Sequence, residues 1–168
     1  FMDIIGELRS TSLAEWNTTL KGFSLDETIR RFLARYLQLT ERKTFLAISA
    51  RAEEIYSEWI DLNPENRSVY FKERLFHLIN ICNSRRKLED DEIAAICLDE
   101  IDNYLQHTDA SLNALMQLHE EIEKDGELKE VAGPKVFQSM LTDADSRKQG
   151  LAERGEPIEN KEGGRSYA

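Results

Sequence analysis

Residues 66–83, NRSVYFKERLFHLINICN, carry apolar side chains at three- and four-residue steps along their whole length. This spacing is typical of an amphipathic α-helix that turns one face to a core. The preceding pair Asn63-Pro64 ends any earlier helix, because the residue before a proline is pushed out of α geometry. The stretch therefore predicts one long helix with a defined start. Its apolar positions are Val69, Tyr70, Leu75, Phe76, Leu78, Ile79 and Cys82.

The same helical period recurs through most of the chain. Two segments begin with the pattern of a capping box, Ser12 followed by Glu15 and Ser24 followed by Glu27. Only eight glycines and three prolines are present, which is few for the many tight turns of a β-sandwich or barrel. Short connections between successive helices favour antiparallel neighbours. The sequence thus predicts an all-α fold, a compact antiparallel bundle of about seven helices. Besides 66–83, helices are expected over residues 2–9, 12–20, 24–39, 42–62, 91–107, 110–125 and 134–146.

The chain of 168 residues has the size of one domain. We expect a single helical domain over residues 1–149. From residue 150 the composition changes to glycine, proline and charged residues with almost no large apolar side chain, which predicts a polar C-terminal tail over residues 150–168. An alternative is an arm that orders on a partner, with Ile158 and Tyr167 as its anchors.

Two histidines and two cysteines raise the question of a metal or catalytic site. His77 and Cys82 lie in the central predicted helix, and Cys97 and His107 lie in the next one. At 100° per residue both cysteines share their helix faces with apolar residues, where a free cysteine packs as a small hydrophobe. A structural zinc site needs four ligands, commonly in Cys-x2-Cys pairs, and the sequence has no such pair. We therefore predict buried thiols, no metal and no cofactor.

The sequence lacks the glycine-rich motifs of nucleotide-binding enzymes and the Gly-x-Ser-x-Gly motif of hydrolases. Half of the eight glycines lie at residue 150 or later, so too few remain in the predicted domain to form a glycine-rich phosphate-binding loop. We predict no catalytic residue. An enzyme of unknown chemistry around His77 and His107 stays open as an alternative, because catalytic groups need not be neighbours in sequence.

Charge is distributed unevenly along the chain. The net charge is −10, yet residues 21–51 carry seven basic and three acidic groups, and residues 89–130 carry fourteen acidic groups and two lysines. Overall acidity repels phosphate backbones and disfavours nucleic acid as a partner. The basic and acidic segments can pair inside one molecule as a solvated surface. Alternatively they can pair between subunits or with another protein, which gives fast, salt-sensitive association.

The basic face lies on the predicted helix that begins near residue 24 and on the residues after it. Arg31, Arg35 and Arg42 share one side at i, i+4 and i+11. Phe32 and Tyr36 follow the apolar period of the same helix, so we expect both rings in the core. That placement argues against a stacking platform for single-stranded nucleic acid.

These patterns predict a non-catalytic helical interaction or adaptor module, whose partner is another protein or a second copy in a homo-oligomer. An alternative is a nucleic-acid-associated regulator that uses the basic face of residues 21–51. No run of 18 apolar residues is present, so no membrane span is expected. Two cysteines without a recognisable leader predict a reducing, cytoplasmic location. The candidate interaction residues are Arg31, Arg35, Arg42, Asp99, Asp102, Glu120 and Glu123.

Overall fold

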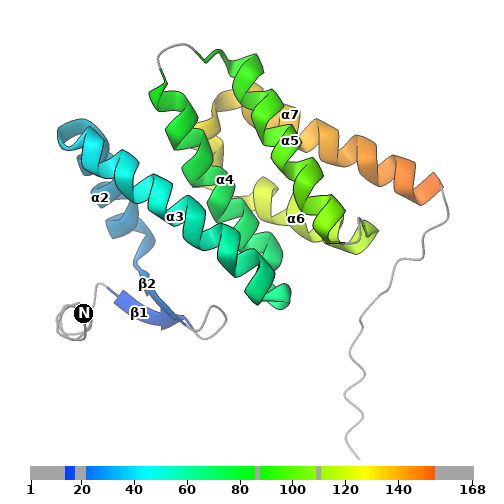
Figure 1. Cartoon of the computed structure of the whole chain (residues 1–168), viewed down its shortest axis with the longest axis horizontal. Helices are drawn as coiled ribbons and strands as arrows, with labels where there is room; N and C mark the ends of the chain where they lie inside the picture. The colour runs from blue at the N-terminus through cyan, green and yellow to red at the C-terminus, as the bar shows by residue number, and fades with distance from the viewer. Residues whose placement is uncertain (1–13, 18–21, 86–87, 109–110, 154–168) are drawn as a thin grey trace, which may run out of the picture.

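The computed structural model describes residues 14–17, 22–85, 88–108 and 111–153. Helices dominate this part of the chain, which confirms the all-α class, although it contains six α-helices where about seven were predicted. Among the described residues, no helix combines the length and the apolar composition needed to cross a bilayer. Figure 1 shows the elements in chain order. They are β1 (Ala14–Asn17), β2 (Gly22–Leu25), α2 (Glu27–Thr40), α3 (Arg42–Leu62), the 3-10 turn η1 (Pro64–Asn66), α4 (Arg67–Ser84), α5 (Asp90–His107), α6 (Leu112–Lys124) and α7 (Gly126–Glu153).

The two earliest predicted helices have different outcomes. The helix expected over residues 2–9 lies outside the described residues. The helix expected over residues 12–20 is wrong, because β1 pairs antiparallel with β2, with Trp16 in register with Phe23. A segment of nine residues is too short to be a stable helix on its own. Aromatic residues such as Trp16 and Phe23 also favour strands, so the short hairpin is the better local structure.

α4 is the centre of the fold. It packs against α3 on one side and against α5, α6 and α7 on the other (Figure 1). Leu75 and Ile79 of the predicted apolar face are fully buried, and both cysteines lie in the core as predicted, with Cys82 2% and Cys97 0% exposed. α4 to α7 thus supply most of the buried apolar surface. The core includes Phe71, Leu75, Ile79, Cys82, Ile93, Cys97, Ile101, Leu115, Leu118, Ile122, Leu128, Val136 and Met140.

The last helix, α7, is longer than predicted. It bends at Gly133, whose φ of 73° and ψ of 166° interrupt the helical geometry. Pro134 follows and restarts the helix, because the fixed φ of proline suits a first helical turn. The expected break at this point is therefore a kink. α7 then continues to Glu153, so the first four residues of the predicted tail, 150–153, are helical. The rest of that tail, residues 154–168, lies outside the described residues.

Candidate interaction surface

α2 exposes its apolar face, and none of its described side chains belongs to the buried core. Phe32, Tyr36 and Leu39 lie one to two turns apart on this face and are 66%, 50% and 70% exposed. Leu33 beside them is 42% exposed. The prediction that Phe32 and Tyr36 lie in the core is therefore wrong. We call Phe32, Leu33, Tyr36 and Leu39 the α2 stripe.

Ion pairs with α7 explain why α2 lies in this orientation. Arg30 Nη2 donates a hydrogen bond of 2.9 Å to Glu127 Oε1, and Arg31 Nη2 donates one of 3.0 Å to Glu130 Oε2. Both carboxylates lie near the start of α7, and charge-assisted hydrogen bonds of this kind are stronger and more directional than neutral ones. They turn the polar side of α2 toward α7, which leaves the α2 stripe facing outward.

Amide hydrogen bonds hold the other end of α2 against α4. Gln38 Nε2 donates to Asn80 Oδ1 at 3.1 Å, and Asn80 Nδ2 donates to the carbonyl of Phe76 at 2.9 Å. Asn80 is only 6% exposed, so its amide needs these partners. Arg42, one of the predicted interaction residues, is the first residue of α3 and donates to the carbonyl of Ser84 at 3.3 Å. Polar contacts thus hold α2 at both of its ends, and its half-buried apolar residues are Ile29, Ala34 and Leu37.

A cavity of about 600 Å³ lies between α2, α4 and α7. Arg31, Phe32 and Arg35 form its α2 wall, so two of the predicted interaction residues and one residue of the α2 stripe line the same cavity. Phe76 of α4 and Val131 of α7 add apolar surface to the opposite walls. The α2 stripe and this cavity therefore form one continuous surface that is joined at Phe32.

The size of the α2 stripe is significant for a chain of this length. An aromatic side chain presents about 150–250 Å². At the observed exposures, Phe32 and Tyr36 alone leave roughly 200 Å² of surface open. With Leu33 and Leu39 the patch reaches the few hundred Å² at which exposed apolar surface commonly marks an interaction site.

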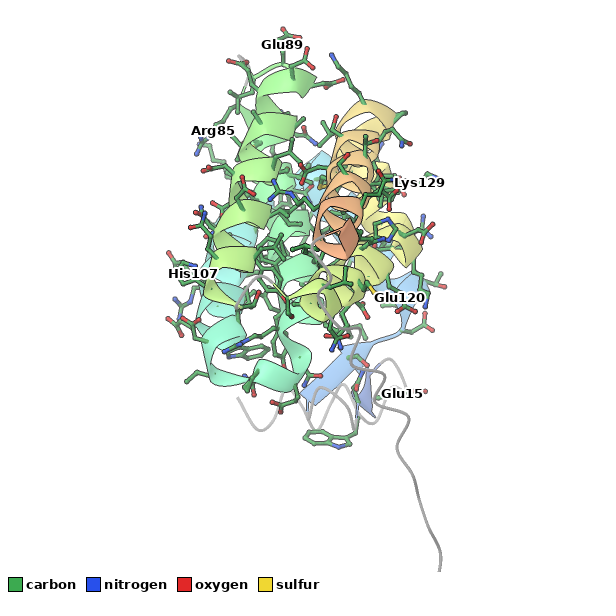
Figure 2. The ribbon with its side chains drawn as sticks, turned by 90° about the vertical axis from the view of Figure 1, so that its right-hand side faces the viewer. Glu15, Arg85, Glu89, His107, Glu120 and Lys129 are labelled. Atoms are coloured by element: carbon green, nitrogen blue, oxygen red, sulfur yellow. The ribbon has the colours of Figure 1, made fainter. Side chains whose placement is uncertain are left out.

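The predicted acidic residues lie on other parts of the molecule. Asp102 of α5 pairs with Arg147 of α7, and on α6 Glu120 pairs with Lys124. Asp99 is exposed on α5, and the carboxylate of Glu123 lies 3.8 Å from the ring of His119. In Figure 2, Glu120 points outward from α6 at one edge of the molecule, while His107 points outward from α5 at the opposite edge.

The carboxylates that meet the basic helix are Glu127 and Glu130, which were not singled out in the sequence. They are separated from their partners, Arg30 and Arg31, by 97 and 99 residues. No local pattern connects positions so far apart. Their place near the start of α7 does favour acidic side chains, because the helix dipole is positive there, but this signal does not name a partner.

His77 packs as an aromatic residue between α3 and α4. Its ring stacks on Tyr56 with centroids 5.9 Å apart and meets Phe76 edge-on at 5.2 Å. Among the described residues its Nδ1 has no hydrogen-bond partner, and burial lowers the pKa of His77 below its usual 6.5. His107 is exposed, and its Nδ1 lies 2.6 Å from the carbonyl oxygen of Asn103. Neither histidine lines the cavity beside α2.

The cysteines and acidic residues do not gather into a metal site in the described part of the chain, where no group of three or more His, Cys, Asp or Glu residues is placed to hold an ion. Burial raises the pKa of the Cys97 thiol to about 12 and also raises that of Cys82. Both thiols are therefore protonated at neutral pH, and a protonated thiol is a poor nucleophile and a poor metal ligand. The α2 stripe and its cavity remain the best-defined candidate surface.

Comparison of the chain with protein-family models, with curated proteins and with solved structures finds no match. The α2 stripe, its arginines and the adjoining cavity are therefore the features from which a function can be inferred.

Proposed function

We propose that this chain is a non-catalytic protein-interaction module whose binding face is the α2 stripe together with the cavity beside it. The observation that supports the proposal most directly is the exposure of Phe32, Tyr36 and Leu39 on one helix face. Exposed apolar surface is unfavourable in water, and polar contacts hold α2 so that this face stays outside. A partner that covers the α2 stripe removes that cost.

A cross-linking experiment tests this function even while the partner is unidentified. A photoreactive amino acid is placed at Leu39 in the α2 stripe or at Leu62 at the end of α3, and the full chain is expressed in its own cells. These two leucines form a matched pair, because they are 70% and 73% exposed. We expect discrete cross-linked adducts from position 39 and few from position 62. Equal yields at both positions, or no adduct at position 39, would contradict the proposal.

Self-association remains part of the prediction. Light scattering on a sizing column, at low and at high salt, measures it directly. An oligomer that dissociates in high salt and carries no absorbance excess at 260 nm supports assembly through complementary charges. A monomer at both salt concentrations makes a different protein the partner.

A cytoplasmic location is also part of the proposal. Cys82 and Cys97 are both free thiols in the structure, which agrees with a reducing compartment. Cell fractionation measures the location.

One observation favours nucleic acid as a second candidate partner. Phe32 and Tyr36 are exposed beside Arg31 and Arg35, and aromatic rings next to arginines can stack on unpaired bases. The net charge of −10 opposes this function. A labelled single-stranded oligonucleotide at low salt tests it. Binding that is lost when Arg31 and Arg35 are both changed to Glu would support a nucleic-acid-associated regulator.

A further inference from the structure

We infer that the partner of the α2 stripe is an acidic amphipathic α-helix of a different protein, which lies along α2. This inference rests on the proposed function and names the chemistry of the partner.

The spacing of the α2 stripe selects a helix as the ligand. Phe32, Tyr36 and Leu39 stand at i, i+4 and i+7, the same positions that anchor an amphipathic helix in an apolar groove. At 1.5 Å per residue they extend over about 11 Å, or two helical turns. A ligand helix with apolar residues at the same spacing places one side chain opposite each of them.

The arginines beside the α2 stripe favour a ligand with acidic side chains. Arg35 lies about 40° around the helix from Leu39, and Arg31 precedes Arg35 by one turn. Both arginines are exposed. Within the described part of the chain, the hydrogen bond of the Arg35 side chain runs from Nη1 to Oε1 of Gln38 at the long distance of 3.5 Å. A carboxylate on the ligand helix opposite Arg35 can pair with this guanidinium, whereas Arg31 already pairs with Glu130.

The cavity beside α2 offers a place for a large side chain of the ligand. Phe32 forms the border between the α2 stripe and the cavity, and Phe76 and Val131 provide apolar walls behind it. The acidic groups at this cavity, Glu127 and Glu130, already pair with Arg30 and Arg31. An apolar anchor of the ligand therefore fits here without bringing a new charge into the cavity.

A second copy of this chain fits the α2 stripe less well. In an antiparallel two-fold pair of α2 helices, the edges that carry Arg31 and Arg35 meet on the same side and repel. The acidic surfaces of α5 and α6 have the right charge but little apolar area. From α4 to α7, Met116 is the one large hydrophobic residue exposed among the described residues. Docking the α2 stripe there leaves its apolar side chains against polar groups.

The binding test uses a designed probe. A fluorescent helical peptide carries Leu at i, i+4 and i+7 with Glu on the flank that faces the arginines. A second peptide has Lys in place of each Glu, and a third has Ser in place of each Leu. Anisotropy with the full-length chain is expected to show binding of the first peptide only. Leu39→Asp and Arg35→Glu should each weaken that binding by about tenfold or more.

Matched controls separate the α2 stripe from general surface effects. Leu62→Asp changes an equally exposed leucine, and Arg51→Glu changes an exposed arginine on α3. Both variants should bind the Glu peptide as well as the unchanged chain does. Arg35→Glu should in turn prefer the Lys peptide, a reversal that loss of folding does not produce.

Each of the following outcomes overturns the inference. The first is binding of the Glu and Lys peptides with equal affinity. The second is a homodimer that Leu39→Asp dissociates, which makes a second copy the occupant. The third is tighter peptide binding by Leu8→Asp, because residues 1–13 also contain acidic and apolar residues and would then be the occupant. The fourth is tighter binding of an oligonucleotide than of the Glu peptide. Adducts at position 39 without peptide binding leave the proposed function standing and reject only this partner.

Discussion

Arg30, in the first turn of α2, and Glu127, in the first turn of α7, form an ion pair with an Nη2–Oε1 distance of 2.9 Å. The carboxylate is largely buried, whereas the guanidinium remains nearly half exposed. Since α2 contributes no described side chain to the core, contacts of this kind decide where the helix lies. α2 is therefore expected to be less firmly held than α4.

Arg30→Gln should loosen α2 specifically. The change removes the cation that pairs with Glu127, and a partly exposed pair of this type contributes up to about 1 kcal/mol. Hydrogen exchange should then be roughly fivefold faster in α2 and unchanged in α4. Arg51→Gln is the control, because Arg51 pairs with Glu54 inside α3. Unchanged exchange in α2 of the Arg30 variant would show that the ion pair does not position this helix.

Two leucine-to-alanine changes should differ sharply in their effect on stability. Leu75→Ala creates a cavity at a position that is 0% exposed and should lower the free energy of unfolding by about 3–5 kcal/mol. Leu39→Ala, at a 70% exposed position, should change it by no more than about 0.5 kcal/mol. Urea unfolding of both variants measures the difference. A large loss for Leu39→Ala would mean that the α2 stripe is covered within the chain.

Two glycine-to-alanine changes in α7 should have opposite signs. Gly133 has a φ of 73° and a ψ of 166°, a region that essentially only glycine occupies, so Gly133→Ala should cost about 1–3 kcal/mol. Gly150 lies in helical geometry with open space around it, so Gly150→Ala should stabilise by about 0.5–1 kcal/mol. Thermal unfolding of the two variants is the measurement. Equal changes in the unfolding temperature of the two variants would argue against the kink at Gly133.

His77 should make the folded chain less stable in mild acid. Burial lowers its pKa below 6.5, against an opposing attraction from Glu73 on α4 and Glu53 on α3, while Arg30 on α2 lowers it further. The unfolded chain therefore binds a proton more readily than the folded chain. The contribution of neutral His77 to the free energy of unfolding is complete above pH 6.5. It is lost as the pH falls through the lowered pKa of His77 in the folded chain.

His77→Phe should remove this part of the pH dependence, because phenylalanine keeps the ring contact with Tyr56 and does not titrate. Unfolding midpoints between pH 5 and pH 8 measure it. His107→Gln, at an exposed position, serves as the control and should retain the loss of stability in acid. If the His77 variant loses as much stability in acid as the unchanged chain, other groups cause the effect.

The native thiols should resist alkylation. Burial raises the pKa of Cys97 to about 12, so its thiolate is about a thousandfold scarcer at neutral pH than that of an ordinary cysteine. A maleimide should label Cys82 and Cys97 only as the chain unfolds in urea. A cysteine introduced as Leu39→Cys should react at once in the folded protein. Rapid labelling of the native chain would place the thiols outside the core.

The sequence predicted the elements whose apolar period matches their burial. The helix expected over residues 66–83 is α4, and the helix expected over residues 42–62 is α3. Leu75, Cys82 and Cys97 are buried as their spacing indicated. In α4 and α5 the helix face with the apolar residues is the face that meets the core, so local spacing and tertiary packing agree. α3 agrees less well, because Ile48 and Trp59 of its apolar face are exposed.

The sequence did not predict elements whose structure depends on neighbours. The strand pairing of Trp16 with Phe23 replaced a helix that a capping pattern had favoured. α2 has the apolar period of a core helix, yet Phe32 and Tyr36 are exposed. Periodicity shows that a helix has an apolar face, but it does not show which surface covers that face.

By itself, therefore, the sequence determined the helical class, most helix boundaries, the burial of both cysteines and the charge asymmetry, because these follow from local propensity and composition. Only the tertiary structure decided that α2 turns its polar side inward. The contacts responsible, Arg30 with Glu127 and Gln38 with Asn80, join residues 97 and 42 positions apart. Such pairs exist only after the helices have packed, and they leave the α2 stripe open to a partner.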